Sequence, residues 1–331
     1  MTHYSHYRHT WKSMAMGLFA FGLTALAMTS LVSPASASDK KVVGVTLLSL
    51  QYPFLVTLDN AMKAEAAKEG IELISLDPRQ SVATELNQIE DLITKKVNLI
   101  VMIPVDQKTS QAAAKLVNKA GIPLVLLNTR FTDDFTAGGG KFVTYVGSDD
   151  TDAGKIEGQY LADTLPEGGN VIYLVGQYGG ASTERRKTGF DSVIKDHPNL
   201  KVATELQAHG SRAEAKTIME NLLEKYPKGQ LQAFVAQNDE MALGASSAIQ
   251  AAGRLGEFKV LIGIDGSKPA LDAVAAGTMT ATVFQDAVGQ GTQAIVVANK
   301  ILSGETVDPQ YVIPFRLVTK ANVSSFLETS K

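Results

Sequence analysis

The 331-residue chain has no cysteine, a single tryptophan and no marked excess of charge of either sign. Without cysteine there is no disulfide, no thiolate metal ligand and no cysteine nucleophile. The chain has 31 Lys and Arg residues and 34 Asp and Glu residues, and its net charge of -3 gives no basic surface for nucleic acid. We therefore expect no nucleic-acid partner and a fold that depends on its hydrophobic core.

The N-terminal segment has the pattern of a secretory signal peptide. Residues 1–13 include Arg8 and Lys12 and no acidic residue, residues 14–32 are apolar, and small residues follow up to Ser38. This pattern predicts cleavage after Ala37, with residues 1–37 removed. An uncleaved membrane anchor is the alternative, but the Ala-x-Ala site favours cleavage. A secreted chain without cysteine fits the bacterial periplasm.

From residue 41 onward, short apolar runs alternate with amphipathic segments. The predicted strands are 42–48, 71–76, 99–103, 123–127, 142–146, 171–175, 202–206, 233–236, 259–264, 279–284 and 311–318. The predicted helices are 54–69, 84–96, 107–120, 152–165, 212–226, 239–252 and 287–303. This alternation predicts an α/β fold of two lobes, each with a doubly wound parallel sheet.

Residues with catalytic or cofactor-binding patterns are scarce. His197 and His209 are the two histidines after the predicted cleavage site, and neither lies near a serine in a nucleophile motif. The glycine-rich stretches 137–141 and 176–180 match neither a phosphate loop nor a dinucleotide fingerprint, so we interpret both as turns. We expect no enzymatic activity, no cofactor and no metal.

The predicted strands are followed by amides, carboxylates and one arginine, with aromatic residues nearby. In doubly wound sheets, ligands bind beyond the carboxyl ends of the strands. Amide, carboxylate and guanidinium groups can each bond two neighbouring hydroxyls of a sugar or polyol. Tyr52 and Phe54 are candidates for covering an apolar sugar face.

At these positions the chain resembles the ribose-type periplasmic sugar-binding proteins of ABC transporters, from about residue 41 to residue 320. Three stretches carry the resemblance: Gln51–Leu55, Ala236–Ala245 and Gly263–Ser267. The resemblance implies a type I periplasmic binding protein, in which two lobes joined by three hinge strands close around one ligand. It places the crossings near Ser148, Gln285 and Pro314. The lobes would then be 38–148 with 286–314, and 149–285 with 315–331.

The resemblance also implies ligand roles for individual residues. Phe54 corresponds to an aromatic that stacks on the sugar ring, and Arg186 to an arginine that binds ring hydroxyls. Further hydroxyl contacts are implied for Asn128, Asn238, Asp265 and Gln285. The alternative for each of these six is helix capping or a hydrogen bond within the protein.

Four positions depart from the ribose-binding pattern. Tyr52 replaces an Asn, Leu55 a second stacking Phe, Thr129 an Arg and Gly210 an aromatic that lines the pocket. These changes open space and remove charge, which favours a hexose or a cyclitol such as inositol over ribose. Arg130 is a candidate to replace the missing guanidinium.

The resemblance implies that the closed, ligand-bound monomer docks on a membrane permease driven by an ATPase. A sensor that presents its ligand to a chemoreceptor or kinase is an alternative. A secreted carbohydrate-active enzyme is another, with Asp239 and Asp265 as the carboxylate pair. A repressor of the lactose-repressor type is disfavoured, because a signal peptide stands where that family has a helix-turn-helix.

Overall fold

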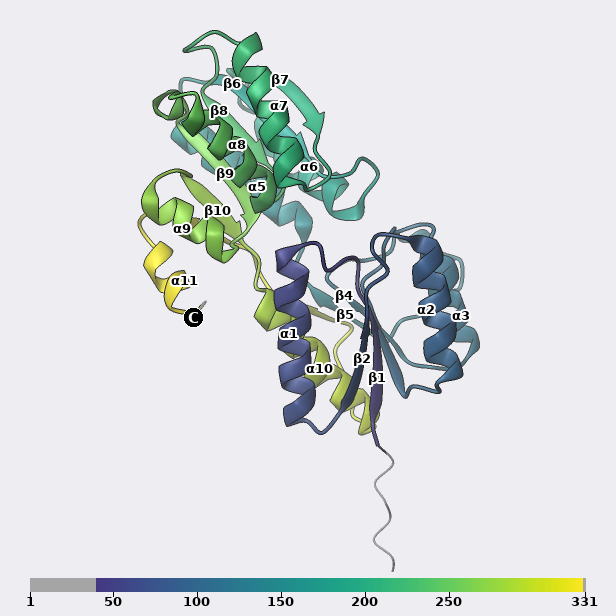
Figure 1. The fold of residues 1–331 in the computed structure, drawn as a ribbon. Helices are drawn as coiled ribbons and strands as arrows, with labels where there is room; N and C mark the ends of the chain where they lie inside the picture. Colours follow the sequence, from purple (N-terminus) through teal and green to yellow (C-terminus); the bar gives the residue numbers. More distant parts are fainter. Residues whose placement is uncertain (1–39, 330–331) are drawn as a thin grey trace, which may run out of the picture. The chain divides into compact units, whose positions relative to one another are not determined.

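The computed structural model describes residues 40–329, so the predicted signal peptide lies outside the described residues. The described chain forms two six-stranded sheets, each covered by helices on both faces (Figure 1). The predicted pair of doubly wound α/β lobes is confirmed. In residues 40–329, no helix combines the length and the apolar character that crossing a membrane requires.

The N-terminal lobe is built on a fully parallel sheet with strand order β11-β5-β4-β3-β1-β2. Its strands are β1 (Val42–Thr46), β2 (Glu72–Leu76), β3 (Leu99–Met102), β4 (Leu124–Leu127), β5 (Thr144–Gly147) and β11 (Gln310–Val312). Its helices are α1 (Pro53–Lys68), α2 (Val82–Thr94), α3 (Gln111–Lys119), α4 (Asp134–Ala137) and α10 (Ala287–Leu302). Helices α1 and α10 pack on one face of the sheet, and α2 and α3 pack on the other (Figure 1). Two apolar layers therefore enclose this sheet.

The C-terminal lobe repeats this plan with strand order β12-β10-β9-β8-β6-β7, in which only β12 is antiparallel to its neighbour. Its strands are β6 (Gly169–Val175), β7 (Leu200–Gln207), β8 (Ala233–Ala236), β9 (Val260–Asp265), β10 (Ala281–Phe284) and β12 (Arg316–Thr319). Its helices are α5 (Asp150–Thr164), α6 (Ala181–Ile194), α7 (Arg212–Lys225), α8 (Asp239–Ala251), α9 (Lys268–Ala276) and α11 (Val323–Thr329), with a 3-10 turn at Leu255–Glu257. Helices α5 and α6 cover one face of this sheet, and α7, α8, α9 and α11 cover the other.

The chain passes between the two sheets three times, at 148–149, 285–286 and 313–315. Two of these segments are bonded to each other, because the Ser148 hydroxyl donates to the Ile313 carbonyl at 2.5 Å. The Gln290 side-chain amide in turn donates to the Ser148 hydroxyl at 2.9 Å. The first and third connecting segments therefore lie side by side, and the first is hydrogen-bonded to α10 of the N-terminal lobe.

The structure corrects the prediction of one strand over 311–318. The segment forms two strands, β11 and β12, which belong to different sheets. Pro314 lies between them, and proline has no N–H to continue a strand ladder. Helices α6 and α9, and the short helices α4 and α11, were not predicted. The run Glu184–Lys187 interrupts the apolar period of α6, and Pro269 lies in the first turn of α9.

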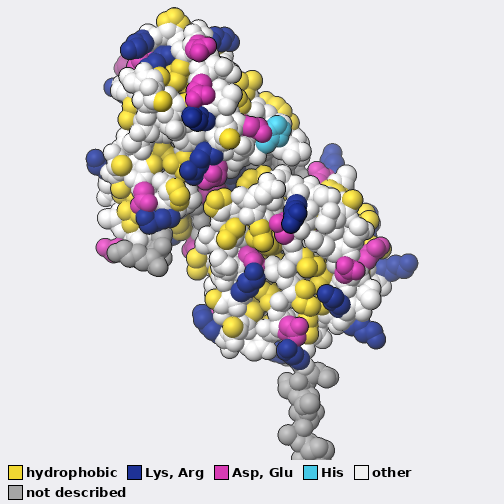
Figure 2. All heavy atoms as spheres, viewed as in Figure 1, with side chains coloured by type: hydrophobic (Ala, Val, Ile, Leu, Met, Phe, Trp, Pro, Cys, Tyr) yellow, Lys and Arg dark blue, Asp and Glu magenta, His cyan; other side chains and the backbone are white. Residues whose placement is uncertain are grey.

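Figure 2 shows acidic and basic side chains interspersed over the visible face of the molecule. This face has no field of a single sign, which agrees with the nearly balanced composition.

Candidate ligand-binding site

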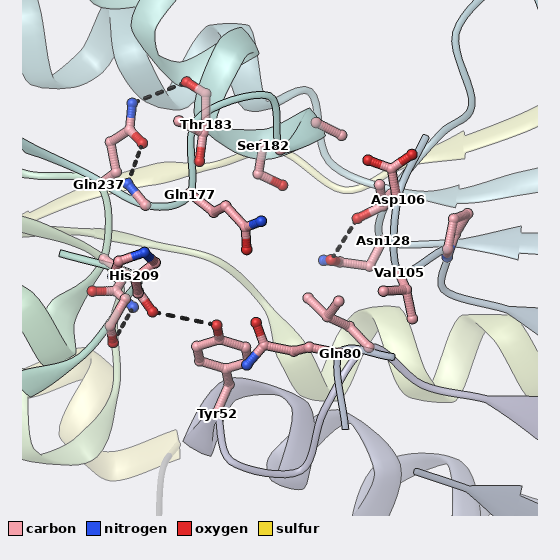
Figure 3. Close-up of a pocket in the computed structure, with 18 of the residues that line it drawn as sticks. Tyr52, Gln80, Val105, Asp106, Asn128, Gln177, Ser182, Thr183, His209 and Gln237 are labelled. Carbon is pink, nitrogen blue, oxygen red and sulfur yellow. Dashed lines mark hydrogen bonds between the residues drawn. The ribbon is translucent and has the colours of Figure 1, made fainter. Parts of the chain in front are cut away.

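A cavity of about 420 Å³ lies at the carboxyl ends of the strands, and residues from both lobes line it. Seven of the eight predicted site residues are among its lining residues, namely Tyr52, Phe54, Asn128, Arg186, Asn238, Asp265 and Gln285. The fold therefore gathers residues that are more than 200 positions apart in the sequence, from Tyr52 to Gln285. Figure 3 shows the side chains of one part of this cavity.

Arg186, on α6, is the buried cation of the cavity. Its Nε donates to Asp150 at 2.8 Å, one terminal nitrogen donates to the Gln237 carbonyl, and the other donates to the Gln285 side chain at 3.3 Å. Burial lowers the pKa of Arg186, but Asp150 and Asp265 outweigh this effect and raise it. A guanidinium has five N–H groups, so the three bonds leave two donors for a ligand.

Asp265 ends β9 with a φ of 132°, a conformation that is unusual for any residue other than glycine. Its carboxyl group lines the cavity beside the Arg186 guanidinium. Burial raises the pKa of Asp265 well above its usual range, the nearby Asp239 adds to this effect, and Arg186 opposes it. The carboxyl group can therefore act as a hydrogen-bond donor or acceptor toward a hydroxyl.

Asp239 is fully buried and does not line the cavity. Its carboxylate accepts hydrogen bonds from the Ser267 amide at 2.7 Å, the Ser267 hydroxyl at 2.9 Å and the Thr282 hydroxyl at 2.7 Å. These bonds tie the start of α8 to β10 and to the start of α9. Asp239 therefore has a structural role, and the carboxylate pair of the enzyme alternative is not formed in the cavity.

Asn238 combines the capping role with a place in the cavity wall. Its side-chain oxygen accepts from the Met241 amide at 2.9 Å as the N-cap of α8, and its side-chain nitrogen donates to the Gly210 carbonyl at 3.2 Å. The second N–H of this amide remains available to a ligand. Capping and ligand contact are thus compatible at this position.

The N-terminal lobe contributes an aromatic residue and an amide to the cavity. Phe54 lies in the first turn of α1, where Pro53 starts the helix without needing an N–H partner. Asn128 follows β4 with a φ of 61°, and its side-chain nitrogen donates to Gln290 at 3.0 Å. A positive φ is a conformation that asparagine adopts more readily than most other non-glycine residues.

Tyr52 occupies part of the space that an aromatic residue at position 210 would take. A Cβ atom on Gly210 would lie 3.0 Å from Cε1 of Tyr52 and 3.1 Å from the side-chain nitrogen of Asn238. The Tyr52 hydroxyl donates to the His209 carbonyl at 3.4 Å (Figure 3). The Tyr52 ring therefore offsets part of the space that glycine leaves at position 210.

Arg130 is the one predicted site residue that does not line this cavity. Its guanidinium lies over the Tyr145 ring, 4.1 Å from the ring centroid. The Tyr145 hydroxyl donates to the carbonyls of Asn128 and Ser148, both at 2.8 Å. Arg130 thus covers a tyrosine that holds the connection between the lobes.

The cavity also has polar lining residues that were not predicted as ligand contacts, namely Gln80, Asp106, Gln177, Ser182, His209 and Gln237 (Figure 3). Asp106, Gln177 and Gln237 lie close after β3, β6 and β8, so the strand-end rule points to them. Gln80 has a φ of 61° and lies further beyond its strand, and no sequence signal marked it. His209 lies in the loop after β7 and also lines the cavity.

The resulting cavity has the aromatic rings of Tyr52, Phe54 and Tyr178, several amides, a buried guanidinium and the carboxyl groups of Asp106 and Asp265, of which Asp265 has a raised pKa. In residues 40–329, no group of three or more His, Asp or Glu side chains is placed to hold a metal ion. This combination suits a neutral ligand that has several hydroxyls and one apolar face.

Comparison with known proteins gives consistent results. A family model described as a periplasmic binding protein domain matches residues 43–306. The ribose import binding protein of Salmonella typhimurium is 34% identical over 93% of this chain and 100% of its own length. A putative rhizopine-binding protein of Rhizobium meliloti is 32% identical over 94% of this chain and 99% of its own length.

Solved structures show the same similarity. An ABC transporter solute-binding protein from Bacillus halodurans with bound myo-inositol has a TM-score of 0.82 at 34% identity, covering 88% of this chain and 99% of that chain. A Caulobacter myo-inositol-binding protein with bound myo-inositol has a TM-score of 0.81 at 26% identity, covering 87% of this chain and 97% of that chain.

Proposed function

Because the chain belongs to the periplasmic binding protein family, we propose that it captures a sugar or polyol between its two lobes and delivers it to an ABC transporter. The observation that carries this proposal is the convergence of polar side chains from both sheets on one cavity. Arg186 keeps two free N–H donors there, and Asp265 lies beside it. The relatives named above are binding and import proteins, so their names support a binding function rather than catalysis.

We propose a cyclitol or a hexose as the ligand class. A ring with hydroxyls on its edge and C–H groups on its face matches polar groups around a stacking aromatic, here Phe54. Asn128, Asn238, Asp265 and Gln285, together with Arg186, are the proposed hydroxyl contacts. The two similar structures that contain myo-inositol support this choice.

We propose that the ligand is bound by closure of two lobes, 38–148 with 286–314 and 149–285 with 315–331. The three connecting segments act as the hinge. Closure requires that the ligand bind the closed form more tightly than the open form, because equal affinity for both forms shifts no equilibrium. A ring that contacts Phe54 in one lobe and Arg186 in the other meets this requirement.

The proposed partners are the permease of an ABC transporter and its ATPase, with this protein acting as a monomer in the periplasm. Energy for transport comes from that ATPase, since neither glycine-rich stretch of this chain matches a nucleotide-binding loop. Export through a signal peptide cleaved after Ala37 is part of the same proposal.

A thermal-shift screen of residues 38–331 against pentoses, hexoses, sugar acids, polyols and inositols tests the function. A ligand at about 100 times its dissociation constant stabilises the folded state by about 2.7 kcal/mol, which raises the melting temperature by a few degrees. We expect a cyclitol or hexose to give this shift, and Arg186→Ala and Asp265→Ala to abolish it. A panel with no stabilising compound overturns the proposal.

A further inference from the structure

A buried carboxyl group lies behind the cavity wall of the N-terminal lobe. Glu85 lies in the first turn of α2 and is fully buried. One oxygen accepts a hydrogen bond from the Val105 amide at 3.0 Å, and the other accepts from the Ser110 hydroxyl. Both oxygens are thus bonded to the segment between β3 and α3, which lies 20 to 25 residues further along the chain.

Glu85 also acts on a second amide of this segment. The Asp106 amide donates to the Ser110 hydroxyl at 3.1 Å, and that hydroxyl donates to Glu85. The amides of two successive residues, Val105 and Asp106, are therefore held by one carboxyl group, the first directly and the second through Ser110. Both amides would otherwise lack a partner from the sheet, because β3 ends at Met102.

Residues 104–109, the segment bonded to Glu85, form part of the cavity wall. Five of its residues line the cavity: Pro104, Val105, Asp106, Gln107 and Thr109. The segment is bonded within itself as well, because the Asp106 carboxylate accepts from the Thr109 amide at 2.7 Å and from the Lys108 amide at 2.9 Å. Residues 104–109 thus form a compact turn that is anchored from behind by Glu85.

Glu85 lies on the buried, apolar face of α2, where a carboxyl group is unusual. The next residues on the same face of α2, Ile89 and Leu92, are fully buried in an apolar core. A carboxyl group at such a position carries a desolvation cost that an apolar residue avoids. Its two bonds to a cavity-lining segment supply a reason for its presence.

We propose that Glu85 is a positioning residue of the binding site, which fixes residues 104–109 against the ligand through Val105 and Ser110. This inference rests on the proposed function, because the ligand is the polyol proposed above. Glu85 does not itself line the cavity, so it acts on the ligand only through this segment.

The anchor also responds to pH. Burial raises the pKa of Glu85 to about 7, the bonds from Ser110 and Val105 lower it, and the charge of Asp106 raises it. Strand β1, which packs against α2, has no titratable residue, and the lysines of α3, Lys115 and Lys119, are exposed. Asp106 is thus the charged neighbour that acts on this group.

Protonation changes the direction of one hydrogen bond. The ionised carboxylate accepts from both Val105 and Ser110, whereas a protonated Glu85 donates its proton to the Ser110 hydroxyl. The folded-state pKa is above the ordinary value, so the contribution of Glu85 to stability is largest below that value and decreases as the pH rises through about 7. Glutamine mimics the protonated form at every pH.

Calorimetric titration with myo-inositol as the probe, at pH 5.5, 7 and 8.5, tests the proposal on four proteins: the wild type, Glu85→Gln, Glu85→Ala and Glu90→Gln. Glu90 is exposed on the same helix and provides the matched control for loss of one charge. We expect Glu85→Ala to weaken binding about tenfold, the effect of losing bonds to a buried group, with Glu85→Gln and Glu90→Gln close to wild type at pH 5.5. Between pH 5.5 and 8.5 the affinity changes more in the wild type than in Glu85→Gln, which keeps the Asp265 carboxyl group in the cavity.

A second measurement needs no ligand. In nuclear magnetic resonance spectra, the backbone amides of Val105 and Asp106 should titrate together with a midpoint near the Glu85 pKa of about 7 in the wild type and not in Glu85→Gln. Unchanged affinity in a folded Glu85→Ala, or amides that do not titrate, overturns the positioning role. Titrating amides in a wild type that binds no compound of the polyol panel support the anchor and overturn the proposed function instead.

Discussion

The two lobes have the same sheet plan but supply different chemistry to the cavity. The C-terminal lobe places a buried Arg186 among Asp150 and Asp265, with each bond fixed by the protein before a ligand arrives. The N-terminal lobe supplies the rings of Phe54 and Tyr52, the amides of Asn128 and Gln80 and the carboxylate of Asp106, and among the described lining residues it contributes no cation. The C-terminal lobe thus offers a preorganised polar wall around a buried cation, and the N-terminal lobe offers a partly aromatic wall without a cation.

This difference indicates how the cavity distinguishes ligands. Buried donors and acceptors strongly reject a molecule that leaves them unpaired, whereas an aromatic surface tolerates many rings. We therefore expect the C-terminal lobe to determine which hydroxyl pattern binds and the N-terminal lobe to determine ring size and orientation. Substitutions at Arg186 and at Phe54 distinguish these two roles.

Arg186→Ala should have the largest effect. It leaves Asp150 and Asp265 without their cation and removes the two free N–H donors, so we expect at least a hundredfold loss of affinity and a decrease of about 3–5 kcal/mol in the free energy of unfolding. Calorimetry and urea denaturation measure the two effects. A variant that binds the ligand within about tenfold of wild type would contradict the assignment of the polar wall.

Glu157→Met should stabilise the C-terminal lobe. Glu157 on α5 is fully buried, and neither of its carboxyl oxygens has a hydrogen-bond partner. Burial raises its pKa well above the usual range, so its contribution to stability is largest at acidic pH and decreases as the pH rises through the folded-state pKa. We expect a gain of about 1–2 kcal/mol at pH 7 that grows at alkaline pH, measured by urea denaturation.

The control for this prediction is Glu167→Met, which removes a carboxylate at an exposed position of the same lobe. Its unfolding free energy should stay within about 0.5 kcal/mol of wild type at each pH. An unstable Glu157→Met protein would show that the carboxyl group satisfies a partner within the lobe.

Phe54→Ala tests the aromatic wall. Phe54 is half-buried, so its loss should cost little stability but about tenfold in affinity, the value of one stacking contact. Competition calorimetry with two ring sizes should also show a smaller preference between them. Val56→Ala, an exposed position on the same helix, is the control and should bind as the wild type does.

Arg130→Ala should have the smallest effect on binding. The guanidinium stacks on Tyr145 outside the cavity, so we expect less than a threefold change in affinity, together with a loss of about 0.5–1 kcal/mol of stability. A large loss of affinity with unchanged stability would return Arg130 to the ligand site.

Most of the fold was predictable from short runs that are apolar at consecutive positions, such as Leu99–Ile103. Such runs are typical of strands that are buried on both faces of a parallel sheet. The predictions of individual strands and helices that were wrong or missing have local causes. The break at Pro314 separates two strands that look continuous in sequence, and the charged face of α6 hides its helical period. Neither feature changes the alternation on which the fold class depends.

The cavity was predictable in position but not in detail. The strand-end rule and the family resemblance point to Arg186 and Asp265, whose residue types match their chemistry. Gln80 and the anchoring role of Glu85 were not predicted, since each depends on which distant segment lies opposite. The effect of Gly210 on the cavity was not predictable either, because it depends on the Tyr52 ring of the other lobe.

The alternation of strands and helices, the lack of cysteine chemistry and the polar strand ends can be read from the sequence, because they are properties of single positions and short periods. The structural role of Asp239, the stacking of Arg130 on Tyr145 and the anchoring of the cavity wall by Glu85 became visible in the folded chain. Each of these roles depends on hydrogen-bond partners and burial that residues distant in the sequence supply.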